Sequence, residues 1–245
     1  MISYQLYSSR NHGPLADTLS MLRSAGYQEV EGYGALLTGD PGALKAALDE
    51  AGLTMGSAHM GLDMLEGGVE TAVALGLASV FAPHVMPADR PADAEGWRAF
   101  GARLAELGGP YEDAGIAFGW HNHDFELAPL PDGSVPLDHI LASGIAWEAD
   151  LAWVVRGGAD PLAWIDRHAE RLRAVHVKDI APQGEKADED GWADPGTGTM
   201  DWRALTDRLN RLGLAHWVME HDNPSDDARF ARAGMDAAAA LGMAR

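Results

Sequence analysis

The sequence predicts an α/β protein folded as a closed (β/α)8 TIM barrel, and three observations support this prediction. Short apolar runs alternate with longer amphipathic stretches along the whole chain, a pattern typical of parallel strands joined by crossover helices. Eight such strand–helix units fit in 245 residues, the usual size of this barrel. A doubly wound open sheet would usually use fewer strands, and its phosphate-binding patterns GxGxxG and GxxxxGK(S/T) are absent. We therefore expect one domain spanning residues 1–245.

The expected strands and helices follow in order along the chain. The strands are short apolar runs at residues 2–8, 27–33, 53–60, 77–85, 116–125, 145–150, 173–180 and 214–222. The helices are amphipathic runs at residues 15–26, 41–52, 67–76, 92–115, 136–143, 160–172, 201–213 and 225–244. Pro41 suits a helix start, and Gly26 and Gly52 suit helix ends. Pro110 can break the helix expected at 92–115, because proline disrupts helical hydrogen bonding.

One connection stands out by its length. Residues 181–200, between the last two expected strands, are acidic and rich in Gly and Pro. Loops of this length in a compact domain are usually either functional or mobile.

The composition of the chain argues against some kinds of binding partner and some kinds of metal ligand. The formal net charge of −19 opposes binding to a phosphate backbone, so we expect no nucleic-acid partner. No apolar run approaches the roughly 18 residues of a membrane span, and the N-terminal segment lacks the layout of a signal peptide, so we expect a cytoplasmic protein. The acidic surface fits a small neutral or cationic ligand, and it equally fits simple solubility. With no cysteine, any metal must be held by His, Asp and Glu.

Ionisable side chains lie at the ends of seven of the eight expected strands. In chain order they are Glu31, His59, His84, His121 with His123, Asp150, His176 with Lys178 and Asp179, and Glu220 with Asp222. Because the carboxyl ends of barrel strands meet at one face, where active sites of this fold lie, these side chains predict a site there.

The last four strands each offer a metal ligand: a histidine after the fifth strand, then Asp150, His176 and Glu220. Imidazole and carboxylate together suit a divalent ion with open positions. Such an ion can polarise a substrate oxygen and stabilise an enediolate formed beside a carbonyl. Each residue also has a structural explanation: a strand-end histidine often only makes a hydrogen bond, and Asp150 could cap the next turn.

Six motifs carry a resemblance that covers essentially the whole chain. They are GYQEVEGYG, HNHDFE, EADLAW, HVKD, GTGTMDW and MEHDNP. Together they resemble the sugar phosphate isomerase/epimerase-like proteins of the xylose isomerase-like barrel superfamily. HVKD followed by the Gly-x-Gly-x-x-Asp-Trp loop is the most specific pair.

The resemblance implies one divalent metal, with Mn preferred and Mg, Co or Zn as alternatives, held by His121, Asp150, His176 and Glu220. Many members of the family have Glu where His121 stands, and in the epimerases that Glu is one of two acid/base carboxylates. Its absence puts a two-glutamate epimerisation in doubt. Glu220 remains a candidate base. His123, on the same side of the strand as His121, is the candidate second acid/base group, or it orients a ligand.

Glu126 leaves two further alternatives open. It could hold one of the two histidines in position without itself binding the metal. Alternatively, it could replace His121 as the ligand of the fifth strand.

The implied activity is that of an isomerase or epimerase acting on a sugar or keto-sugar through an enediolate. The alternative is a lyase or dehydratase acting on 3-oxo-glycosides or inososes, because the HNHDFE variant looks like members with that chemistry. A third class, a non-catalytic sugar-binding barrel, is disfavoured by the complete ligand set. A DNA-repair endonuclease of the superfamily has Asp-x-x-His after the sixth strand, and here Trp153 stands in place of that histidine.

Substrate contacts are expected from residues around the mouth. Glu31, His59 and His84 could bind hydroxyls, and Trp153 could stack on a sugar ring or pack the barrel mouth. Lys178 could bind a substrate oxygen or pair with a carboxylate, and Asp179 is expected to be structural. Apolar barrel faces often form dimers or tetramers, so a homo-oligomer is a further expectation.

Overall fold

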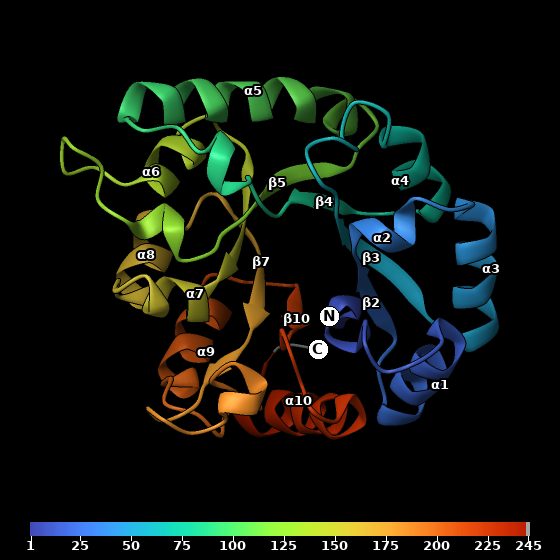
Figure 1. Ribbon diagram of the computed structural model, residues 1–245. Coiled ribbons are helices and arrows are strands. Elements are labelled where there is room, and N and C mark those ends of the chain that lie inside the picture. The colour runs from blue at the N-terminus through green and yellow to red at the C-terminus, as the bar shows by residue number, and fades with distance from the viewer. Residues whose placement is uncertain (244–245) are drawn as a thin grey trace.

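A computed structural model describes residues 1–243 and confirms the TIM barrel. Eight parallel strands close in the order β1-β10-β7-β6-β5-β4-β3-β2, and Figure 1 shows the helices forming a ring outside them. The strands are β1 (Ile2–Gln5), β2 (Glu29–Gly32), β3 (Thr54–His59), β4 (Ser79–Ala82), β5 (Ala117–His121), β6 (Ala146–Asp150), β7 (Leu172–Val177) and β10 (Trp217–Met219). Each overlaps an expected strand.

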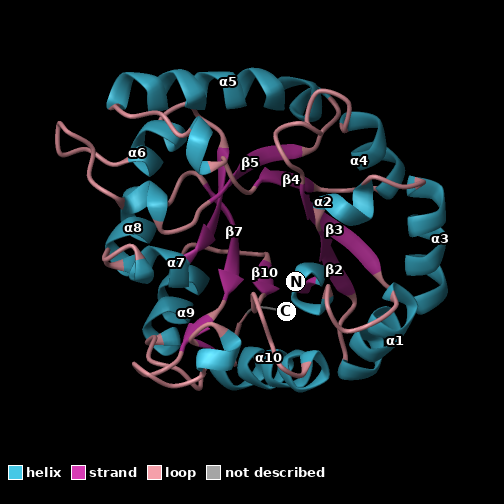
Figure 2. Cartoon of the chain, viewed as in Figure 1, coloured by secondary structure: helices cyan, strands magenta, loops and turns pink. Residues whose placement is uncertain are grey.

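The helices alternate with the strands (Figure 2). They are α1 (Leu15–Ala25), α2 (Gly34–Leu37), α3 (Pro41–Ala51), α4 (Val69–Leu75), α5 (Ala94–Asp113), α6 (Pro136–Leu141), α7 (Leu151–Arg156), α8 (Pro161–Arg167), α9 (Trp202–Arg211) and α10 (Asp227–Leu241). Short 3-10 turns are η1 (Leu6–Ser9), η2 (Pro87–Asp89), η3 (Phe125–Leu127) and η4 (Ala187–Glu189). The sequence analysis missed α2 and α7, and the final residue of the helix expected at 225–244 lies outside the described residues. None of the described helices is both long and apolar enough to cross a membrane.

The expected break in α5 is wrong, because the helix runs unbroken through Pro110. Pro110 lies in the last turn of α5, which continues to Asp113. That turn is also fixed from outside: Tyr111 is fully buried and its hydroxyl donates to the carbonyl of Leu65 at 2.9 Å. Packing against the barrel therefore outweighs the local effect of proline.

The long loop after β7 is ordered around one carboxylate. β8 (Asp179–Ile180) pairs with β9 (Trp192–Ala193) as an antiparallel hairpin, so the strand expected at 173–180 is two strands. The Asp179 carboxylate accepts backbone N–H bonds from Ile180, Gly196, Gly198 and Met200 at 2.8–3.1 Å. Asp179 thus has the structural role expected from the sequence, and it turns the loop back over the end of β7.

The barrel interior is polar. Alternate residues of barrel strands point inward, and in most such barrels they are branched apolar residues. Here His59 of β3 contacts Glu148 of β6, although β4 and β5 separate these strands in the sheet, so the contact passes through the interior. The buried polar residues of the barrel strands are Ser3, Gln5, Glu31, Ser57, His59, Ser79, His121, Glu148, Asp150 and His176. Most apolar packing lies on the outer faces of the strands, although Phe81 and Val218 share the inward face, and the interior can hold a site.

Candidate active site

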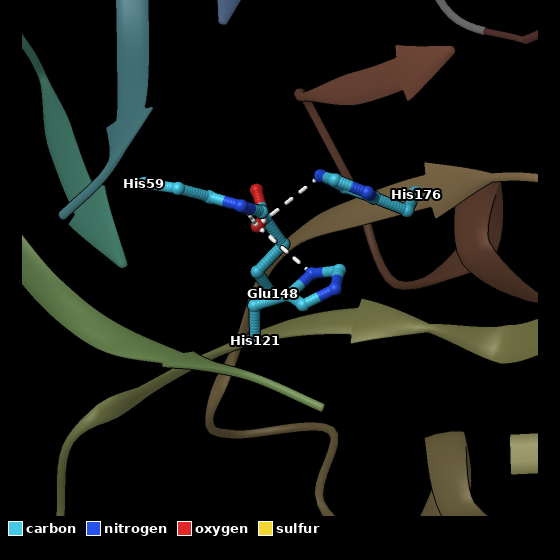
Figure 3. A group of neighbouring side chains, drawn as sticks. All are labelled: His59, His121, Glu148 and His176. Carbon is cyan, nitrogen blue, oxygen red and sulfur yellow. Dashed lines mark hydrogen bonds and ion pairs between the residues drawn. The ribbon is translucent and has the colours of Figure 1, made fainter. Parts of the chain in front are cut away.

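Three imidazoles surround one carboxylate inside the barrel. His59 Nε2, His121 Nδ1 and His176 Nε2 lie 2.6, 3.2 and 3.2 Å from Glu148 Oε2. Figure 3 shows the three rings converging on Glu148 from β3, β5 and β7. The sequence analysis did not single out Glu148. A signal was present, because a residue two positions before Asp150 on a strand lies on the same face.

Glu31 lies beneath this cluster and is fully buried. Its Oε1 accepts from Gln5 Nε2 at 2.8 Å and lies 2.7 Å from His176 Nε2, and its Oε2 accepts from the Ser57 hydroxyl. These partners make Glu31 a support for His176 within the barrel. Its expected contact with substrate stays a prediction.

The four ligands expected from the sequence come together at the carboxyl ends of β5, β6, β7 and β10. One ligand atom from each of His121, Asp150, His176 and Glu220 lies within 4.8 Å of the others. His176 Nδ1 lies 2.8 Å from Glu220 Oε2. Asp150 Oδ1 accepts from the backbone N–H of Trp153 at 2.9 Å, so it also caps α7, as its position suggested.

Lys178 is a buried cation beside these ligands. Its Nζ lies 3.0 Å from Asp150 Oδ2, 2.8 Å from Glu220 Oε2 and 2.9 Å from Asp222 Oδ2. Burial alone lowers the pKa of Lys178, but the three carboxylates raise it above its ordinary value. Of the two roles considered from the sequence, the geometry supports pairing with carboxylates.

The charge states of the imidazoles differ. Burial lowers the pKa of His176, but three neighbouring carboxylates raise it well above its ordinary value. The pKa of His59 is also raised, because nearby carboxylates outweigh its burial. For His121, burial and the neighbouring rings lower the pKa well below its ordinary value. His121 is therefore neutral, the form in which imidazole binds metals.

A cavity of about 410 Å³ opens onto this face of the barrel. Its lining residues are Tyr7, Tyr33, Gly34, His59, Gly61, Pro83, His84, His121, His123, Glu220 and Asp222. His59, His84, His121, His123, Glu220 and Asp222 were expected near the mouth, whereas Tyr7 and Tyr33 were not assigned from the sequence. A second depression of about 360 Å³ at the other end of the barrel is lined by residues without acidic, basic or imidazole side chains.

Comparison with known proteins places the chain in a family. The family model described as xylose isomerase-like TIM barrel matches residues 19–241. The chain belongs to this family. This confirms the resemblance drawn from the six motifs.

Individual relatives of this xylose isomerase-like barrel are distant. Rhizopine catabolism protein MocC of Rhizobium meliloti is 25% identical over 240 residues, which cover 84% of this chain and 74% of MocC. Inosose dehydratase of Lacticaseibacillus casei is 22% identical over 166 residues, 58% of this chain and 54% of the dehydratase. The relatives by sequence therefore include an inosose dehydratase and a protein of rhizopine catabolism.

Solved structures share the fold. A sugar phosphate isomerase/epimerase from Parabacteroides distasonis superposes with a TM-score of 0.80, 19% identity and coverage of 98% of this chain and 94% of its own. The IOLI protein, solved with a bound zinc atom, gives a TM-score of 0.77 at 14% identity, with coverage of 98% and 97%.

His123 lies next to His121 in this site, with ring centroids 5.1 Å apart. Its ring also contacts His84, Phe125 and Trp153. Its Nδ1 is buried and has no hydrogen-bond partner among the described residues. Burial, more than any neighbouring charge, lowers the pKa of His123 well below its ordinary value, so the ring is neutral.

Glu126 supports the segment that carries the two histidines. Its Oε1 accepts from Trp120 Nε1 at 2.8 Å, and its Oε2 accepts from the backbone N–H of His123 at 2.9 Å. The side chain is fully buried, and burial raises its pKa to about 8. Of the two alternatives for Glu126, these contacts favour a role outside the ligand set.

Asn122 joins the end of β5 to that of β6. Its Oδ1 accepts from Trp147 Nε1 at 2.8 Å and from the Asp150 N–H at 3.1 Å, and its Nδ2 donates to the Asp150 carbonyl at 3.1 Å. No local sequence signal marks this role, which depends on the pairing of the two strands. Asn122 fixes the backbone of Asp150.

Trp153 packs at the barrel mouth. Its ring lies 5.3 Å from that of His123 and 4.8 Å from that of Trp192, in the hairpin that follows β7. It does not belong to the residues that line the described cavity. Of the two roles expected for it, the geometry favours packing.

The residues fit a divalent ion of the hard or borderline kind. Two imidazoles and two carboxylates converge, all buried, and His121 Nδ1 forms no hydrogen bond of suitable geometry. Buried polar atoms without such partners are costly, and an ion would satisfy them. Because Asp150 Oδ2 and Glu220 Oε2 also contact Lys178, an ion bound here shares its carboxylates with that ammonium group.

Proposed function

We propose that the protein is a divalent-metal-dependent isomerase or epimerase that acts on a sugar or keto-sugar through an enediolate. The observation that carries this proposal is the convergence of His121, Asp150, His176 and Glu220 beside a cavity of about 410 Å³ whose lining includes imidazole and carboxylate side chains. A cavity of this size suits a monosaccharide. Two carboxylates in the ligand set favour Mn²⁺, with Mg²⁺, Co²⁺ or Zn²⁺ as alternatives.

The bound ion would supply Lewis-acid polarisation of the substrate carbonyl. The protein's own task is to bind the polyol and move a proton. His123 is the better placed of the two candidate bases, because its Nδ1 has no hydrogen-bond partner among the described residues and can accept a proton. Glu220 Oε2 is held by His176 and Lys178, and although burial raises its pKa, these two cations bring it well below the ordinary value. Glu220 is therefore better suited to hold the ion.

Recognition of the hydroxyl groups would fall to the polar residues of the cavity wall. Tyr7 and Tyr33 lie edge to face with centroids 5.4 Å apart, and Arg10 lies over the Tyr7 ring at 3.8 Å. On another part of the cavity wall, His84 Nε2 lies 3.1 Å from Arg90 Nη2. Tyrosine hydroxyls and imidazoles donate and accept hydrogen bonds, as a polyol requires.

A second candidate function is a lyase or dehydratase acting on inososes or 3-oxo-glycosides. One observation favours it: inosose dehydratase is among the relatives by sequence. The family resemblance adds that His121 stands where many epimerases are expected to have an acid/base glutamate. The first step, removal of the proton beside the carbonyl, is common to both candidates.

Product analysis separates the candidates. The protein is incubated with Mn²⁺ and, in turn, a ketohexose, an inosose and a 3-oxo-glycoside, and products are identified by NMR. A new stereoisomer or an aldose–ketose pair supports the isomerase or epimerase. Loss of water from the inosose, or aglycone release without an epimer, supports the lyase or dehydratase. No reaction with any of the three substrates would contradict both.

A further inference from the structure

The cluster around Glu148 is a second set of metal-ligand atoms, which shares His121 and His176 with the four ligands described above. One ligand atom from each of His59, His121, Glu148 and His176 lies within 4.8 Å of the others, and all four residues are buried. We infer that this set, here called the deep set, is a cation position of its own that selects zinc-type ions, distinct from the mouth set of His121, Asp150, His176 and Glu220. The inference does not depend on the proposed reaction.

The deep set lies one residue layer further into the barrel than the mouth set. Glu148 precedes Asp150 by two residues on β6, so both point inward from successive layers. His176 serves both sets with different nitrogens: Nε2 lies 3.2 Å from Glu148 Oε2, and Nδ1 lies 2.8 Å from Glu220 Oε2. His59 and His121 also line the cavity, which gives an ion a route from solvent.

Two atoms of the deep set have no hydrogen bond of suitable geometry among the described residues. They are Glu148 Oε1 and His121 Nδ1, and both residues are almost completely buried. Buried polar atoms in native proteins nearly always have partners, so such atoms call for an explanation. A cation held between the carboxylate and the three imidazoles provides one.

The two sets differ in whether a lysine or arginine side chain already pairs with their carboxylates. In the mouth set, Asp150 and Glu220 already contact the Lys178 ammonium group at 3.0 and 2.8 Å. Within residues 1–243, neither Glu148 nor its neighbour Glu31 makes an ion pair with a lysine or arginine. An ion in the deep set therefore competes with no permanently charged side chain.

The donor types set the metal preference. Three imidazoles and one carboxylate form a ligand set that suits Zn²⁺ and Co²⁺ better than Mg²⁺ or Mn²⁺, which favour oxygen-rich sites. The mouth set has one more carboxylate and one fewer imidazole. The deep set should thus take zinc, whereas the mouth set is the better position for manganese.

The test uses Co²⁺ as a paramagnetic probe of zinc sites in the full-length protein. Metal-stripped protein receives one equivalent of Co²⁺, and the hyperfine-shifted exchangeable N–H protons of coordinated imidazoles are counted by NMR. The deep set predicts three such protons in the wild type and two in His59→Gln. His84→Gln, which removes a cavity imidazole outside both sets, should keep three. Two protons in the wild type, unchanged in His59→Gln, would overturn the inference.

Measurement of Zn²⁺ affinity is a second test of the deep set. Zn²⁺ affinity should fall at least about 100-fold in the pair His59→Gln and Glu148→Gln, since loss of ligands costs more than loss of their supporting contacts. The pair Asp150→Asn and Glu220→Gln should keep Zn²⁺ affinity within a few fold of wild type. The reverse pattern would refute the deep set and leave the proposed enzyme intact. The proposed enzymatic activity is tested separately, by the product analysis with the three substrates: absence of any product would contradict that activity and not the deep set.

Discussion

Lys178 sets the charge of the mouth of the barrel. Its ammonium group lies within 3.0 Å of oxygens from Asp150, Glu220 and Asp222, and the side chain is fully buried. Removing one member of a buried ion network leaves the remaining charges uncompensated. Lys178 therefore stabilises the metal-free protein, and it would compete with a bound ion for the same carboxylates.

We predict opposite effects of Lys178→Met on stability and on metal affinity. Without metal, the variant should lose about 3–5 kcal/mol of unfolding free energy. Its affinity for Mn²⁺ should rise about tenfold or more, because Asp150 and Glu220 no longer contact an ammonium group. Thermal unfolding with and without Mn²⁺, together with titration calorimetry, measures both. Lys45→Met, which removes an exposed pair with Asp49, is the control and should change stability by less than about 1 kcal/mol. Unchanged Mn²⁺ affinity in Lys178→Met would contradict the competition.

Glu126 should make stability depend on pH. Its pKa in the folded protein is about 8, above the ordinary 4.5, so the folded state binds its proton more tightly than the unfolded state. The stabilising contribution is complete below pH 4.5 and is lost as pH rises through 8. Between pH 5 and 8 this amounts to roughly 3–5 kcal/mol. Glu126→Gln should flatten the curve of unfolding free energy against pH relative to wild type, as measured by urea denaturation. Parallel curves for the two proteins would show that Glu126 does not titrate in this range.

At the scale of elements, the sequence predicts where strands and most helices lie, because apolar periodicity and Gly or Pro signals are local. It does not predict that the loop after β7 is ordered. That order depends on Asp179 accepting N–H bonds from Gly196, Gly198 and Met200, which are 17–21 residues away. The unbroken α5 is a similar case, since tertiary packing of its last turn decides the outcome at Pro110.

Gly198 tests the role of this loop. A Cβ added at Gly198 would collide with the Asp179 carboxylate and with the carbonyl oxygen of Ile180. We predict that Gly198→Ala lowers unfolding free energy by about 1–3 kcal/mol, because the backbone must move away from Asp179. Gly109→Ala in α5 is the matched control: a Cβ there meets no atom within 4 Å, and alanine favours helix by up to about 1 kcal/mol. Equal stability of the two variants in urea would contradict the proposed packing.

At the scale of the whole molecule, closure of the barrel assembles the site from strands that are not neighbours in the sequence. The strand ends could be predicted to meet because parallel strands share one face, and this was enough to bring His121, Asp150, His176 and Glu220 together. Glu148 and Asn122 were missed because their roles depend on cross-barrel contacts and on strand pairing. Glu148 is the more instructive, since an acidic residue facing inward two positions before Asp150 could have been noticed.

Metal-dependent removal of the proton beside a carbonyl is the central claim for this barrel, and proton exchange in D2O tests it most directly. NMR follows exchange of the proton next to the carbonyl of a ketohexose and of an inosose in the presence of Mn²⁺-loaded protein. Chelation of the metal, or Asp150→Asn, should slow exchange at least about 100-fold, because metal activation and its ligands act only through this step. Asp160→Asn, at the exposed start of α8, should exchange as wild type. Exchange that continues at the wild-type rate after chelation and in Asp150→Asn, or no exchange with either substrate, would contradict the claim.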